Sequence, residues 1–112
     1  MNNKFIDYCL HKKGAFQDYP LGEPDPTAIK IAGKIFALFY EEKGYLNLKC
    51  DPVIAERLRE QHEDVRPGYH MNKQHWNTII LAGSLSERDI FAMIDQSYDL
   101  VVKRLPKRSQ AR

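Results

Sequence analysis

One β-hairpin pattern near the middle of the chain constrains the fold most. Ile35–Tyr40 is an unbroken apolar run, and Tyr45–Lys49 alternates apolar and polar residues. The connecting segment Glu41–Gly44 ends on a glycine, which adopts the positive φ that tight turns need. Two such runs joined by a short turn are typical of antiparallel strands. We therefore expect an antiparallel sheet whose core face carries Leu46 and Leu48.

The remaining patterns place helices around this hairpin. In chain order we expect a helix over 2–13, a structured loop over 17–26, a strand Thr27–Ile31, the hairpin, a helix over 53–63, a turn or short edge strand over 65–69, a strand Trp76–Leu81 and a last helix. Hairpin-connected strands with helices gathered on one side predict an α+β fold, a two-layer sandwich of antiparallel sheet and helices.

The second and third helices have clear start signals. Asp51 followed by Pro52 is typical of a cap and first helical position, and Ser86 caps the last helix. We expect the second helix to bury Ile54, Ala55 and Leu58 and to expose Arg59. The last helix repeats apolar residues at helical spacing, and its predicted buried stripe is Ile90, Ile94, Tyr98, Val101 and Leu105.

Length and composition indicate one folded domain. The chain has 112 residues, of which 43% are hydrophobic and 29% charged, so it can build one core without disulfides or metal. We expect a domain over residues 1–105 and a flexible basic tail over 106–112. The last ten residues hold five cations and no acid, and the rest of the chain has twelve cations against fifteen acids. The folded part is therefore mildly acidic, which weakens a case for nucleic-acid binding by the whole domain.

The distribution of apolar residues indicates the cellular location of the protein. No apolar run is long enough to span a bilayer, and the first residues lack the apolar core of a signal peptide. We expect a cytoplasmic protein with no membrane partner, in which Cys9 and Cys50 are buried thiols.

The common catalytic and metal motifs are missing from the sequence. The six glycines are scattered, without the spacing of a phosphate-binding loop, and there is no nucleophile elbow or zinc-protease helix. His70 and His75 are five residues apart, so on a strand they would face opposite ways, and no carboxylate or cysteine stands nearby. We expect no metal, no cofactor and no catalysis, although a hydrolase or transferase site built from distant residues stays open.

The most suggestive residues are cations beside aromatic rings. They are Lys34, Lys49, Arg66, Lys73, His75 and Trp76, with Tyr45 and Tyr69 in nearby turns. Cations projected from hairpins contact phosphates, and aromatic rings stack on bases. The simpler interpretation is that Trp76 belongs to the core and that the lysines keep the sheet soluble.

Several short motifs, in this order, resemble the MmcQ/YjbR-like family of small bacterial proteins. They cover nearly the whole chain and are Gly33-Lys34-Ile35-Phe36-Ala37, Leu46-Asn47-Leu48-Lys49-Cys50, Arg66-Pro67-Gly68-Tyr69-His70-Met71, Lys73-Gln74-His75-Trp76 and Ser97-Tyr98-Asp99-Leu100-Val101. The resemblance implies a fold similar to bacterial frataxin (CyaY-like) and a role in DNA binding through a "double-wing" arrangement of projecting hairpins. Iron binding like that of frataxin does not transfer, because the first helix holds a single acid, Asp7.

The sequence therefore leaves two hypotheses about function. The first is a DNA-binding module without catalysis that uses the cations and Trp76. The alternative is a domain that binds a protein or a small molecule at an aromatic and histidine site formed by Tyr69, His75 and Trp76.

Overall fold

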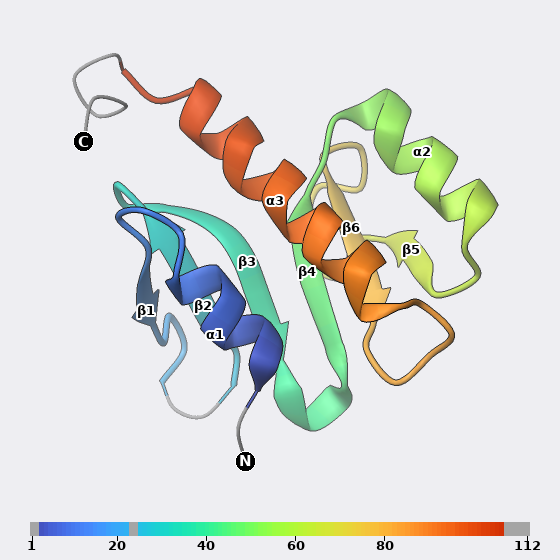
Figure 1. Cartoon of the computed structure of the whole chain (residues 1–112), viewed down its shortest axis with the longest axis horizontal. Helices are drawn as coiled ribbons and strands as arrows, with labels where there is room; N and C mark the ends of the chain where they lie inside the picture. Colours follow the sequence, from blue (N-terminus) through green and yellow to red (C-terminus); the bar gives the residue numbers. More distant parts are fainter. Residues whose placement is uncertain (1–2, 23–24, 107–112) are drawn as a thin grey trace.

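The computed structural model describes residues 3–22 and 25–106 as a six-stranded antiparallel sheet with helices packed on it. The sheet order is β1-β2-β3-β4-β6-β5. The elements are α1 (Lys4–Leu10), β1 (Phe16–Asp18), β2 (Thr27–Ile31), β3 (Lys34–Tyr40), the short 3₁₀ helix η1 (Glu41–Lys43), β4 (Tyr45–Lys49), α2 (Pro52–Gln61), β5 (Val65–Pro67), β6 (Trp76–Ile80) and α3 (Glu87–Lys103). Figure 1 shows α1 and α3 lying across one face of the sheet. The predicted α+β fold is confirmed.

The central hairpin forms as its sequence predicts. Gly44 has a φ of 75° and follows η1, and the first residue pair across the turn is Tyr40 with Tyr45. Alternation along β4 places Leu46 and Leu48 in the core, where they are 0% and 2% exposed.

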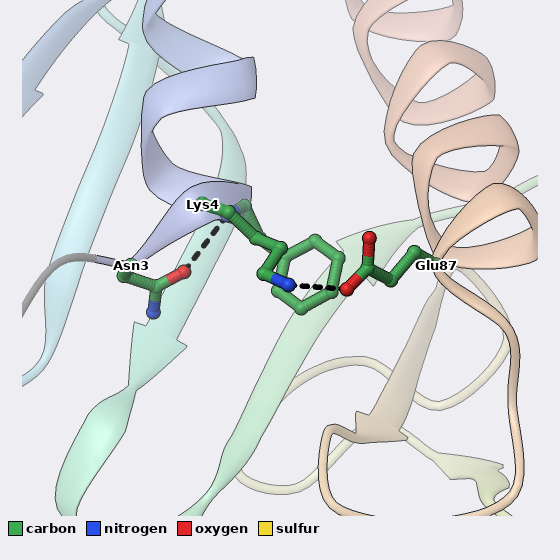
Figure 2. Close-up of polar contacts among 4 residues, drawn as sticks. Asn3, Lys4 and Glu87 are labelled. Carbon is green, nitrogen blue, oxygen red and sulfur yellow. Dashed lines mark hydrogen bonds and ion pairs between the residues drawn. The ribbon is translucent and has the colours of Figure 1, made fainter.

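The helix starts are capped by side chains. Asp51 accepts hydrogen bonds from two backbone N–H groups of α2, and Ser86 accepts one from Asp89. Figure 2 shows Asn3 capping α1 and an ion pair between Lys4 of α1 and Glu87 of α3. Both charged side chains are more than half exposed, so this pair adds little stability.

The core lies between α3 and the sheet. The stripe predicted for α3 is buried or partly buried, and Ile90 and Ile94 are 1% and 0% exposed. Burial of a side chain of this size contributes about 1.5–3 kcal/mol. Cys9 and Cys50 are both buried free thiols, as expected.

The structure corrects several predictions. Phe16–Asp18, at the start of the predicted loop, is a three-residue edge strand paired with β2. Helix α1 is shorter than predicted. Ile54 is 41% exposed, whereas Arg59 is half-buried and donates to Asn77 at 2.7 Å. Helix α2 therefore turns the face carrying Ala55 and Arg59 to the sheet, because a guanidinium that reaches a partner can be buried there.

Two expectations concern regions beyond this core. Within residues 3–22 and 25–106, no helix has the length and apolar character needed to cross a membrane. The predicted basic tail, apart from Pro106, lies outside the described residues.

Candidate anion-binding pocket

Strands β3 and β4 part at one end of the sheet. Their pairing runs from Tyr40 with Tyr45 to Ala37 with Leu48, and Figure 1 shows the two ribbons diverging beyond it, with α3 crossing the face of the sheet at that place. On its other side β3 pairs with β2 through a register shift next to Ile29 and Lys30, which gives β3 one extra residue. Such a bulge bends the strand that carries it and increases its local twist.

A serine of α3 occupies the place where the strands separate. The hydroxyl of Ser97 donates to the carbonyl of Phe36 on β3 at 2.5 Å and accepts from the backbone N–H of Lys49 on β4 at 2.9 Å. Ser97 is fully buried. Its side chain thus satisfies two backbone groups that face each other across the opening, and such groups are costly to leave unpaired when buried.

A pocket of about 350 Å³ lies at this opening. The β2–β3 turn, the ends of β4 and β6, the segment before β6 and the last turn of α3 contribute to it. Its lining residues are Gly33, Lys34, Ile35, Lys49, Met71, Trp76, Val101, Arg104 and Leu105.

Three of these nine residues are cations, and none of the nine is acidic. Lys34 and Arg104 are exposed, whereas Lys49 is half-buried. Burial, together with the charges of Arg104 and Lys34, lowers the pKa of Lys49 below that of an ordinary lysine. The pocket thus concentrates positive charge from three separate elements.

Trp76 forms an aromatic wall beside the recessed cation. It is the only tryptophan in the sequence and is 9% exposed. Lys49 Nζ lies 5.9 Å from the centre of its ring, within range of a cation–π interaction. Gly68 packs against its backbone and donates a hydrogen bond to its carbonyl at 2.9 Å.

The structure brings three of the predicted site residues together and separates the others. Lys34, Lys49 and Trp76 line the pocket. Lys73 and Arg66 do not line it: Lys73 Nζ donates to the carbonyl of Gly68 at 2.9 Å, and the Arg66 guanidinium lies 3.4 Å from the hydroxyl of Tyr69.

Of the alternative trio of Tyr69, His75 and Trp76, only Trp76 borders the opening described above. The ring of Tyr69 packs edge-on against Tyr45, with ring centres 5.1 Å apart. His75 Nδ1 is buried, with no hydrogen-bond partner among the described residues.

Sequence reasoning missed Arg104 and Met71. Arg104 lies among the five cations of the last ten residues, although it follows Val101 of the buried stripe by three residues. That spacing places it on the same face of the last helical turn. The sequence around Met71 has no periodic pattern that would have pointed to the pocket.

Among the described residues, no group of three or more His, Cys, Asp or Glu side chains is placed to hold a metal ion. The three lining cations give the pocket a positive charge.

Comparison with known proteins identifies the family. The YjbR family model matches residues 10–100. The chain is 39% identical over 107 residues to the uncharacterized protein YjbR of Escherichia coli K12, covering 94% of this chain and 90% of that protein. It is 40% identical over 110 residues to the uncharacterized protein YbdF of Escherichia coli O157:H7, covering 96% of this chain and 82% of that protein.

Solved structures agree with this assignment. A crystal structure of a Deinococcus radiodurans protein aligns with a TM-score of 0.86 at 27% identity, covering 94% of this chain and 81% of that one. A crystal structure of a Pseudomonas syringae protein aligns with a TM-score of 0.74 at 32% identity, covering 89% and 98%. The chain therefore belongs to the YjbR family.

Proposed function

We propose that the chain is a non-catalytic nucleic-acid-binding module that contacts phosphate groups through its pocket cations. The observation that supports this most directly is the convergence of Lys34, Lys49 and Arg104 around one opening without an acidic lining residue. Three cations from different elements repel one another, and a phosphate placed between them would relieve that repulsion. The function is the one expected from the sequence, but the contact with nucleic acid is limited to this pocket.

Cations that converge on one pocket can contact the same phosphate together, whereas cations scattered over a surface cannot. Lys34 and Arg104 are exposed and can reach a backbone that approaches from solvent. Phosphate contacts position a nucleic acid without reading its sequence. We therefore expect weak, nearly sequence-independent binding that falls steeply as salt rises.

A fluorescence-anisotropy titration at two salt concentrations tests the proposal. Lys34→Ala and Arg104→Ala should each weaken binding, and each should reduce the salt slope by about one unit. Arg88→Ala is the matched control, because it removes the same charge from the exposed first turn of the same helix, about 24 Å from Arg104 at 1.5 Å per residue. Absence of saturable binding to single or double strands at low salt would overturn the proposal.

The apolar part of the same pocket supports a second candidate, a small anionic ligand. Its volume of about 350 Å³ falls in the range of small-molecule sites, and a few placed charges among apolar walls are typical of them. Thermal stabilisation by a panel of small phosphates and aromatic carboxylates, lost in Lys49→Met, would favour this candidate over nucleic acid.

A further inference from the structure

We infer that the pocket accepts one unpaired nucleotide, with its base among the apolar lining residues and its phosphate at the exposed cations. This inference rests on the proposed function and specifies the form of nucleic acid that the site takes. It follows from how polarity is distributed within the pocket.

Apolar residues form most of the interior of the pocket, and two of its three cations stand at the rim. Trp76, Val101 and Leu105 are 9%, 4% and 8% exposed, and Met71 and Ile35 are half-buried. Lys34 and Arg104, in contrast, are exposed. A ligand that fills this space needs a flat apolar body joined to a negative group, and a nucleotide has that shape.

A paired base cannot use the interior. In a duplex the bases are stacked and paired, so their phosphates reach only groups that project from the surface. Lys34 and Arg104 project in this way, whereas Lys49 is recessed beside Trp76. Only a nucleotide whose base is free can place that base against the indole while its phosphate stays near the rim.

Inorganic phosphate also leaves the interior unused. Contact between a base and an aromatic side chain strengthens single-strand binding by about ten-fold per base. The pocket should therefore bind a nucleotide more tightly than the phosphate backbone alone.

The test compares three ligands by anisotropy at one low salt concentration. They are an oligothymidylate of about twelve nucleotides, which lies within the usual length range of single-strand sites, an abasic strand of the same length, and a duplex of the same length. The single tryptophan gives a second readout, because a base in the pocket quenches the fluorescence of Trp76.

We expect the oligothymidylate to bind about ten-fold more tightly than the abasic strand and to quench Trp76. Met71→Ala removes one wall and should bring the oligothymidylate close to the abasic strand. Lys34→Ala is the control and should weaken all three ligands by a similar factor. Thermal melting of each variant establishes that it is folded.

The outcomes separate this inference from the proposed function. Equal binding of all three ligands without a fluorescence change would overturn the inference and leave the proposed function standing. No binding of any of them would overturn both. Thymidine monophosphate is measured as a fourth ligand. If it bound as tightly as the oligothymidylate, the inference about the pocket would stand and the proposed binding of a strand would be overturned.

Discussion

The hydroxyl of Ser97 on α3 accepts a hydrogen bond of 2.9 Å from the backbone N–H of Lys49 on β4. The same hydroxyl donates to Phe36 on β3, so a helix side chain replaces the direct contact that two paired strands would make. The position of Lys49, and with it the charge at the centre of the pocket, is thereby tied to α3.

Ser97→Ala should destabilise the protein by about 1–3 kcal/mol, because it leaves two buried backbone groups without a partner. It should also weaken anion binding, since the end of β4 loses its anchor. Urea denaturation measures the first effect and anisotropy the second. Gln96→Ala, at the exposed neighbouring position, is the control. An unchanged unfolding midpoint for Ser97→Ala would contradict the proposed role of the hydroxyl.

Lys49→Met should stabilise the protein near neutral pH. The lowered pKa of Lys49 means that the folded state holds this proton less tightly than the unfolded state does. The charged amine therefore costs stability below its folded pKa, and that cost disappears as pH rises to the unfolded value of about 10.5. The gain from Lys49→Met should shrink as pH approaches that value.

Urea denaturation of the parent protein and of Lys49→Met at neutral and alkaline pH tests the direction of this stability change. Added phosphate should stabilise the parent protein more than the variant, because the anion offsets the repulsion among the cations. Lys13→Met, at an exposed position, should change stability by less than about 0.5 kcal/mol. A loss of stability in Lys49→Met at neutral pH would refute the argument.

Cys9 should resist alkylation in the folded protein. Burial raises the pKa of this thiol to about 12, so almost none of the reactive thiolate is present near pH 8. Its contribution to stability is complete below the ordinary thiol value of 9.0 and is lost as pH rises from there to about 12. Maleimide labelling followed by mass spectrometry should show reaction only after denaturant is added. Rapid labelling of Cys9 in native buffer would contradict this.

Gly68→Ala should destabilise the protein by about 1–3 kcal/mol. A Cβ at this position would lie 2.7 Å from the Cβ of Trp76 and 2.9 Å from its carbonyl oxygen, and backbone cannot move aside as a flexible side chain does. Trp76 should shift, which would change its fluorescence and weaken ligand binding. Gly83→Ala is the comparison, because a Cβ there would displace the Asp64 carboxylate and its hydrogen bonds to Ser84 and would not contact Trp76, so the Trp76 spectrum should stay unchanged. An unchanged Trp76 spectrum in Gly68→Ala would count against this packing.

The sequence predicted the elements whose signals are local. The central hairpin, the caps at Asp51 and Ser86 and the buried stripe of α3 each follow from neighbouring residues. The edge strand Phe16–Asp18 was missed because three residues at a sheet edge, two of them exposed, have no alternating pattern. Ile54 was placed in the core on hydrophobicity alone, whereas tertiary contacts of Arg59 decided which side of α2 faces the sheet.

Only some residues of the pocket could be predicted, because the others depend on tertiary structure and have no local sequence signal. Lys34 and Lys49 are recognisable from the sequence as cations on neighbouring strands, but the pairing of β3 and β4 ends before it reaches them, so they line the two sides of an opening that the sequence does not predict. Arg104 was hidden in a run of cations that looked solvated. Ser97 is a small polar residue within an amphipathic helix, and its role depends on where two strands part, which no local pattern reveals.

Where β3 and β4 diverge, the position of the cavity follows from the backbone, and the lining side chains determine which ligand it accepts. The opening lies beside a bulge in β3 and the hydroxyl of Ser97, whereas Ile35 and Met71 contribute to its lining. We expect substitutions of these two side chains to change the ligand that is bound more than the fold. A chain built this way is a suitable starting point for engineered receptors in which Ser97 is retained and the lining is redesigned.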